Sequence, residues 1–118
     1  MIGPYDREAT MAALRRALPY IRLYRNRTFL IKVGGAICGD QAALRDLAEQ
    51  VSILRELGVR VVIVHGGGPQ TTALSEKLGL ETTFVEGRRV TCEKTLEVAV
   101  MTLNGSVNTA ILAACRAG

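Results

Sequence analysis

The sequence of 118 residues has no tryptophan and only 4% aromatic residues, although 48% of its residues are hydrophobic. A core of this composition is aliphatic, which suits helices packed on a parallel sheet. The three cysteines, Cys38, Cys92 and Cys115, form no Cys-x-x-Cys pair, and there is one histidine. These counts do not support a zinc site or a disulfide framework, and they fit free, buried thiols in a reducing cytoplasm.

Long apolar runs are also missing. Charges or glycines interrupt every run before the roughly 20 residues that a membrane span needs, so no membrane segment is expected. The sequence starts without a hydrophobic signal segment, and we therefore expect a cytoplasmic protein. A chain of this length is expected to form one domain.

The net charge of +4 comes from the first 27 residues. They hold six arginines against Asp6 and Glu8, whereas the remaining residues balance nine basic against nine acidic side chains. An arginine-rich segment of this kind is more typical of a solvated helix face or an oligomer contact than of a nucleic-acid-binding surface. We therefore expect no nucleic-acid partner.

The N-terminal segment shows the spacing of an amphipathic helix. Residues 6–18 place apolar side chains on one stripe, and Pro19 predicts a kink or a restart before a short second piece at 20–24. The stripe is narrow and precedes the first strand, which suits docking on a partner subunit. A packed or frayed arm is the alternative.

Two aliphatic, β-branched runs at 28–33 and 59–64 are typical of parallel strands that are buried on both faces. Between them, Asp40 is a suitable N-cap for a helix that ends at Leu57, and Gly58 suits a left-handed C′ position. This strand–helix–strand unit predicts a parallel, right-handed pair.

The second half of the chain predicts a hairpin and two helices. Strands at 80–85 and 88–90 would be joined by a turn at Glu86-Gly87. Thr91 would cap a helix that ends near Asn104-Gly105, and a last helix would begin at Ser106. The predicted class is α/β, with helices packed on a mostly parallel sheet.

A glycine loop follows each predicted parallel strand, Lys-Val-Gly-Gly at 32–35 and His-Gly-Gly-Gly-Pro at 65–69. Parallel strands bring both loops to one sheet edge, and glycine N–H groups at the start of a helix bind anions. Lys32 would be costly at a strand end unless its ammonium reaches an anion or solvent. The loops therefore predict one site for a ligand with several phosphates. Neither the Walker pattern nor Gly-x-Gly-x-x-Gly is present.

These loops belong to a longer series of motifs. Val-Ile-Val-His-Gly-Gly-Gly-Pro-Gln spans 62–70, Phe-Val-Glu-Gly-Arg-Arg-Val-Thr spans 84–91 and Leu-Asn-Gly-Ser-Val-Asn spans 103–108. With Lys-Val-Gly-Gly at 32–35, they resemble the N-terminal half of the N-acetylglutamate kinases, in the amino acid kinase superfamily. The resemblance implies a three-layer α/β/α fold. Residues 1–27 would be an N-terminal helix and 28–118 the lobe that binds the acyl substrate, with the ATP-binding lobe outside these residues.

The resemblance also implies an activity and a set of roles. The complete enzyme would transfer the γ-phosphoryl group of ATP, bound with Mg²⁺, to the side-chain carboxylate of N-acetyl-L-glutamate, a step of arginine biosynthesis. Lys32 would stabilise the transferring phosphoryl group. Gly34 and Gly35 would donate N–H groups to phosphate oxygens, and Gly67 and Gly68 would bind the acyl substrate. No metal ligand and no prosthetic group are assigned to these residues.

Arg89 would hold the α-carboxylate of N-acetylglutamate, because its planar guanidinium matches a carboxylate. Its neighbour Arg88 is so similar that sequence alone does not separate the two. His65 closes a predicted strand, where a hydrogen-bonded structural role is more typical than acid–base catalysis. The family usually has an acidic residue in place of Cys92 and a lysine in place of Ser106.

Two other functions are compatible with the sequence. One is a kinase-like, arginine-sensing domain of an N-acetylglutamate synthase, against which the retained Lys32 argues. The other is a non-catalytic assembly module built around the N-terminal helix. The leader Ala-Leu-Pro-Tyr-Ile at 17–21 resembles the helix that joins dimers into hexamers in arginine-inhibited kinases, so a homo-oligomer is expected: a dimer, or a hexamer through this helix. The 118 residues alone are expected to be inactive.

Overall fold

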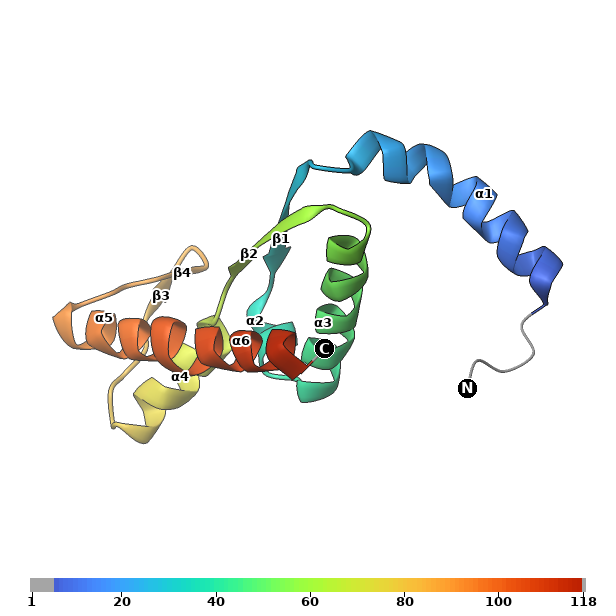
Figure 1. Cartoon of the computed structure of the whole chain (residues 1–118). Helices are drawn as coiled ribbons and strands as arrows, with labels where there is room; N and C mark the ends of the chain where they lie inside the picture. Colours follow the sequence, from blue (N-terminus) through green and yellow to red (C-terminus); the bar gives the residue numbers. More distant parts are fainter. Residues whose placement is uncertain (1–5, 118) are drawn as a thin grey trace.

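The computed structural model describes residues 6–117, and helices make up most of it (Figure 1). Its first half contains α1 (Arg7–Tyr24), β1 (Thr28–Val33), α2 (Gly35–Cys38), α3 (Gln41–Glu56) and β2 (Arg60–His65). Its second half contains α4 (Gly68–Lys77), β3 (Phe84–Val85), β4 (Arg88–Arg89), α5 (Glu93–Val100), a π-helical stretch η1 (Met101–Val107) and α6 (Asn108–Ala117). The predicted α/β class and the N-terminal helix are confirmed.

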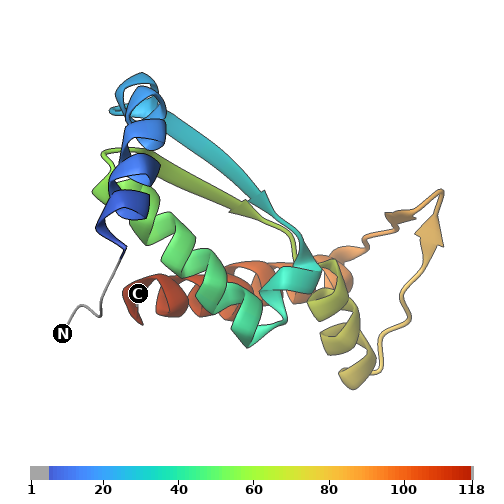
Figure 2. The same cartoon turned by 90° about the vertical axis from the view of Figure 1, so that its right-hand side faces the viewer.

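Strands β1 and β2 pair in parallel, in the register from Thr28 opposite Arg60 to Val33 opposite His65. Helices α3 and α6 lie together on one side of this pair (Figure 2). On the opposite face Leu30 is 71% exposed, and Val62 and Val64 are about half exposed. The prediction that these strands are buried on both faces is wrong for residues 6–117, because the helices of this part of the chain pack on one face only.

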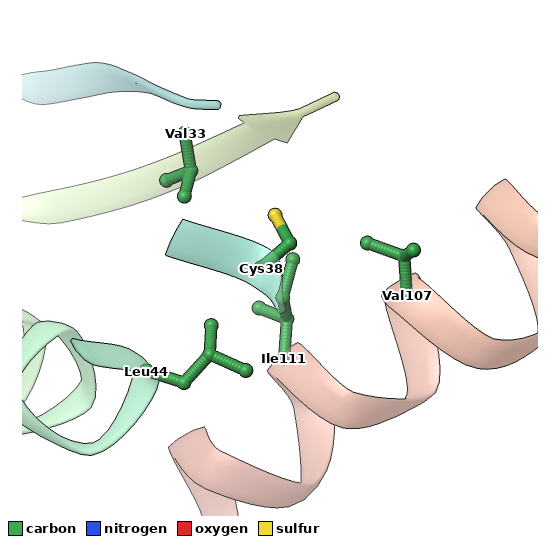
Figure 3. Packing of buried hydrophobic residues seen from close by; sticks show 5 residues of the cluster. All are labelled: Val33, Cys38, Leu44, Val107 and Ile111. Carbon is green, nitrogen blue, oxygen red and sulfur yellow. The ribbon is translucent and has the colours of Figure 1, made fainter. Parts of the chain in front are cut away.

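The hydrophobic core lies between the strand ends and the helices. Val33, Cys38, Leu44, Val107 and Ile111 are each less than 10% exposed and face one another (Figure 3). They come from β1, α2, α3, η1 and α6, so one cluster joins the first and the last parts of the chain. Burying side chains of this size contributes about 1.5–3 kcal/mol each. Because Val33 immediately precedes the first glycine loop, the core also fixes the position of that loop.

Helix α3 begins and ends where the sequence predicts. The Asp40 carboxylate accepts hydrogen bonds from the N–H groups of Ala42 at 2.8 Å and Ala43 at 3.2 Å, which satisfies two of the free donors of the first turn. Gly58 has φ of +84° just beyond the helix end, a conformation that favours glycine. The cap and the terminator both act locally, which is why the sequence reveals them.

Helix α1 extends away from the rest of the molecule (Figure 1). It contains no buried residue, and Met11 and Leu14 are about half exposed. The radius of gyration is 19.3 Å, compared with about 13 Å for a compact domain of 100 residues. The helix continues through Pro19 to Tyr24, so of the predicted kink or restart the restart does not occur. A proline removes one N–H donor, and the flanking hydrogen bonds of this long helix continue on both sides.

The hairpin lies close to its predicted position. Strands β3 and β4 are antiparallel, with Phe84 opposite Arg89, and Glu86 and Gly87 both have positive φ, at +49° and +75°. Two consecutive positive φ angles are typical of a tight hairpin turn. The first strand is shorter than predicted, because only residues 84–85 of the expected 80–85 pair with β4.

The last helices differ more from the prediction. Helix α5 follows Cys92 as its N-cap, one residue later than expected, and α5, η1 and α6 run on without the predicted break at Asn104-Gly105. Asparagine and glycine weaken a helix by no more than about 1 kcal/mol each. The burial of Thr102 and Val107 on either side of them opposes this cost, because both side chains pack only if the helix continues.

The helical run Glu93–Ala117 is also the one helix within residues 6–117 whose length and mean hydropathy of 1.5 would suffice to cross a bilayer. The sequence was not expected to contain such a run. Its Val107 and Ile111 side chains lie in the hydrophobic core, so packing within the fold accounts for part of its apolar character.

Candidate active site

The two glycine loops are neighbours at the carboxyl ends of β1 and β2. The N–H of Gly66 donates to the carbonyl of Val33 at 2.8 Å, which joins the start of the second loop to the start of the first. The first loop leads into α2 at Gly35 and the second into α4 at Gly68. The site therefore contains two helix N-termini side by side, each with free N–H groups that attract negative charge.

Each loop contains a closely packed glycine and an open one, and the second loop also contains Gly66, which has only ordinary contacts. A Cβ atom at Gly35 would lie 2.7 Å from Cδ of Pro69, and one at Gly67 would lie 2.7 Å from a methyl group of Leu103. A Cβ atom at Gly34 or Gly68 would meet no heavy atom within 4 Å. The packed pair lets the loops and η1 approach one another, while the open pair leaves the main chain accessible to a ligand.

The amide of Gln70 also bridges the loops. Gln70 lies in the first turn of α4, and its Nε2 donates to the carbonyl of Gly35 at 2.6 Å. Thr71, the next residue, donates from its N–H and its hydroxyl to the carbonyl of Gly67, both at 2.9 Å. The Gln70 bond holds the start of α4 against the first loop, and the Thr71 bonds hold it to the second.

Arg89 extends from β4 to the N-terminal turn of α4. Its Nη2 donates to the Thr72 hydroxyl oxygen at 2.6 Å and to the Gly68 carbonyl at 3.1 Å, and its Nη1 lies 3.4 Å from the Thr82 hydroxyl. The guanidinium also lies over the ring of Phe84, with 5.0 Å from Cζ to the ring centre, a favourable cation–π distance.

These contacts separate Arg89 from its neighbour. Arg89 is half-buried and Arg88 is exposed, because successive residues of a strand point to opposite faces. Three of the five N–H donors of Arg89 meet groups among residues 6–117, and the other two form no hydrogen bond within this range. Placed at the start of α4, the fixed positive charge adds to the helix dipole and favours an anion there.

Lys32 lies opposite Val64 near the end of β1 and is exposed. It shares the open face of the sheet with Leu30 and Val64, since alternate residues of a strand point the same way. Its ammonium group is therefore in contact with solvent. The desolvation cost expected for a lysine in a buried strand does not arise here. The structure brings the glycine loops and Arg89 together by direct contacts, and it places Lys32 two residues before Gly34.

His65 is half-buried at the end of β2, with its Nδ1 3.1 Å from the carbonyl of Gly66. Such a contact with the neighbouring main chain agrees with a structural role. No group of three or more His, Cys, Asp or Glu side chains within residues 6–117 is arranged to hold a metal ion.

Sequence reasoning missed four residues of this site: Gln70, Thr72, Thr82 and Phe84. Gln70 closes one of the family motifs but has no role predicted from it. Thr72 could have been found from its spacing, because it lies four residues after Gly68 and so on the same face of α4. Thr82 and Phe84 could not, because their approach to Arg89 depends on the register of the hairpin.

Several known proteins are similar to this chain in sequence. Residues 27–117 match the model of the amino acid kinase family. The chain is 55% identical over 95 residues to the acetylglutamate kinase of Chlorobaculum tepidum, covering 80% of this chain and 33% of that protein. It is 49% identical over 107 residues to the acetylglutamate kinase of Sphingopyxis alaskensis, covering 91% of this chain and 35% of that protein. The chain thus spans about one third of the length of these relatives.

Solved structures give a similar result. The N-acetylglutamate synthase of Neisseria gonorrhoeae, complexed with coenzyme A and N-acetyl-glutamate, superposes with a TM-score of 0.74 at 30% identity, over 90% of this chain and 24% of that chain. The same synthase complexed with coenzyme A and L-arginine also has a TM-score of 0.74, at 32% identity over 88% of this chain and 24% of that chain. The family match extends over most of the sequence and includes every residue of the candidate site. The chain therefore belongs to the amino acid kinase family.

Proposed function

We propose that the protein containing this chain is an acetylglutamate kinase, and that residues 28–118 are its acyl-substrate-binding lobe. The reaction breaks the bond between the γ-phosphorus of ATP and the bridging oxygen of ADP. A bond forms between that phosphorus and an oxygen of the side-chain carboxylate of N-acetyl-L-glutamate, giving an acyl phosphate and ADP. The proposal includes a place in arginine biosynthesis and a cytoplasmic location.

The observation that carries this proposal is the position of Arg89 at the start of α4. Its contacts with Thr72 and Gly68 hold a fixed guanidinium beside the second glycine loop, where its positive charge would attract a carboxylate. N-acetylglutamate carries an α-carboxylate for Arg89 and a second carboxylate for the reaction. In this assignment the N–H groups at Gly67 and Gly68 bind the acyl substrate.

The remaining residues suit phosphoryl transfer without a general base. A glutamate-type carboxylate has a pKa of about 4.3 and is already ionised at neutral pH, so it attacks without losing a proton. Phosphoryl transfer requires positioning and neutralisation of the charge on the phosphoryl oxygens. Lys32 and the N–H groups of Gly34 and Gly35 would supply both. ATP brings Mg²⁺ as its substrate complex, and most of the ATP site would lie outside residues 1–118.

The direct test measures ADP release by the protein as its gene encodes it, with Mg-ATP and N-acetyl-L-glutamate. We expect release that depends on N-acetylglutamate, and loss of that dependence in an Arg89→Ala variant, with an Arg88→Ala variant as the matched control. Equal affinity of the Arg89→Ala variant and the unchanged protein for N-acetylglutamate would remove the substrate assignment. The isolated 118 residues are expected to show no turnover.

The structural match to N-acetylglutamate synthase favours one alternative, a kinase-like, arginine-sensing domain joined to an acetyltransferase. The two functions differ in the co-substrate. A synthase would form N-acetylglutamate from glutamate and acetyl-coenzyme A, would not consume ATP and would bind L-arginine. The kinase relatives at about 50% identity and the retained Lys32 favour the kinase. Acetyl-coenzyme A-dependent acetylation of glutamate without ATP consumption would reverse this choice.

We also propose that helix α1 joins copies of the protein. Its apolar stripe includes Met11, Leu14 and Leu18, each between 44% and 51% exposed, and no residue of the helix is buried. Removing residues 1–27 should therefore lower the oligomer mass measured by light scattering, for example from hexamer to dimer. An unchanged mass would leave α1 as an arm without an assembly role.

A further inference from the structure

Gln70 connects two segments that are far apart in the sequence. Its Nε2 donates to the Gly35 carbonyl at 2.6 Å, across a separation of 35 residues. The bond ties the first turn of α4 to the first residue of α2. Each of these two helices starts at one of the glycine loops, so the amide of Gln70 fixes the distance between the loops directly.

Two glycines, Gly35 and Gly39, make room for this amide. A Cβ atom at Gly39 would lie 2.9 Å from Nε2 of Gln70, and a Cβ atom at Gly35 would lie 3.1 Å from its Oε1. At Gly67 the corresponding distance to Oε1 would be 3.9 Å. Approaches near 3 Å are closer than a Cβ atom ordinarily tolerates, so a side chain at Gly35 or Gly39 would displace the amide. Gly35 of the first loop and Gly39 at the end of α2 therefore leave the space that Gln70 fills.

The buried position of the Gln70 amide has a free-energy cost. Its Oε1 is buried and has no hydrogen-bond partner among residues 6–117, and an unsatisfied buried acceptor costs about 1–3 kcal/mol. The opposite orientation of the amide is worse, because it would place Oε1 against the Gly35 carbonyl oxygen. The bond from Nε2 to the Gly35 carbonyl therefore fixes the orientation of the amide.

We propose that Gln70 is a positioning residue, which sets the spacing between the phosphoryl group held at the first loop and the acceptor carboxylate held at the second. This proposal rests on the proposed function, in which each loop holds one reactant. Displacing a reacting group by about 1 Å can lower the rate about 100-fold. Gln70 touches neither reactant and acts through the Gly35 main chain.

Two variants of Gln70 test this role in the protein as its gene encodes it. Gln70→Met keeps the side-chain length but removes the donor. We expect kcat to fall about 10- to 100-fold while KM for ATP and for N-acetylglutamate changes by less than about threefold, because each loop still binds its own ligand. Gln70→Glu lacks the donor at neutral pH but regains one when its carboxyl is protonated, so its kcat relative to the unchanged protein should rise as the pH is lowered.

Gln50→Glu is the matched control, because it adds the same charge on the exposed side of α3 and should leave kcat and its pH profile unchanged. Gly39→Ala is an independent variant that displaces the amide with Gln70 intact, and it should lower kcat in the same way as Gln70→Met. A Gln70→Met variant with unchanged kcat, or a Gln70→Glu variant with no recovery at lower pH, would overturn the proposal.

A second measurement does not depend on catalysis. The N–H groups of Cys38 and Gly39 bond to the carbonyls of Gly34 and Gly35, so Gln70→Met should speed amide hydrogen exchange at α2 and leave exchange in α3 unchanged. Unchanged exchange at α2 would overturn the proposal for Gln70. If the unchanged protein forms no ADP with N-acetylglutamate but exchange at α2 still rises, the proposed function fails and the tie between the loops stands.

Discussion

The candidate site has a packed interior and an open rim, and the same residue types occur in both. Gly35 and Gly67 lie in the packed interior, whereas a Cβ atom added at Gly34 or Gly68 would have nothing within 4 Å. Arg89 contacts α4 while Arg88 is exposed. The difference shows that a motif gives only residue types, and that packing decides at which copy of each type a side chain would meet neighbouring atoms and at which it would meet solvent.

The largest expected effect is the loss of stability in a Gly35 variant. A Gly35→Ala change places a Cβ atom 2.7 Å from the Pro69 ring and 3.3 Å from the Gly67 main chain, neither of which yields easily. Overpacking of this kind costs about 1–3 kcal/mol, so the free energy of unfolding should fall by that amount in denaturant titrations. The matched change Gly34→Ala should cost less than about 1 kcal/mol, because the position is open. Equal losses in the two variants would contradict the distinction between interior and rim.

The next largest effect is expected at the arginine pair. Arg89→Ala removes charged hydrogen bonds that are worth about 1.5–3 kcal/mol, so N-acetylglutamate should bind about 10- to 100-fold more weakly in calorimetric titrations. Arg88→Ala should change the affinity by less than about threefold, because its side chain lies on the opposite face of β4. If Arg88→Ala weakens binding as much as Arg89→Ala, the register of the hairpin does not select the ligand-binding arginine.

A smaller effect is expected at Thr72, which holds Arg89 in place. Its hydroxyl accepts from Arg89 at 2.6 Å and donates to Gly68 at 3.1 Å. Thr72→Val keeps the shape but removes both bonds, at a cost of about 1 kcal/mol, so N-acetylglutamate affinity should fall about fivefold. Thr72→Ser retains the hydroxyl and should restore most of it. Equal affinity of the valine and serine variants would show that Arg89 keeps its orientation without this threonine.

Local chemistry explains which features of the fold could be predicted. The Asp40 cap, the Gly58 terminator and the turn at Glu86-Gly87 depend on residues within a few positions of one another, and all three are found. The parallel pairing of β1 and β2 followed from the length of the connection between them. The neighbouring glycine loops followed from that pairing.

The features that could not be predicted depend on distant packing. Leu30 and Val62 are exposed because the helices of residues 6–117 cover only one face of the sheet. The apolar sequence of a strand does not show which of its faces will be covered. The continuation of the last helices through Gly105 depends on the burial of Val107 in the core. The bond from Gln70 to Gly35 joins residues from separate helices, so no local pattern indicates it.

The smallest expected effect is a difference in reactivity between the cysteines. All three were predicted from the sequence to be buried thiols. Cys92 is exposed. The Thr95 hydroxyl lies 3.4 Å from the Cys92 Sγ, and this hydrogen bond is the main cause that lowers the pKa of Cys92. Burial raises the pKa of Cys38. The thiolate is the reactive form, so with rising pH iodoacetamide should label Cys92 first and Cys38 slowly, as followed by mass spectrometry. Thr95→Val removes the hydroxyl and should move the Cys92 profile to higher pH, while Thr95→Ser should not. The main-chain N–H of Thr95 also lowers the pKa of Cys92, so the shift should be partial, and an unmoved profile would mean that the hydroxyl has no influence on this exposed thiol.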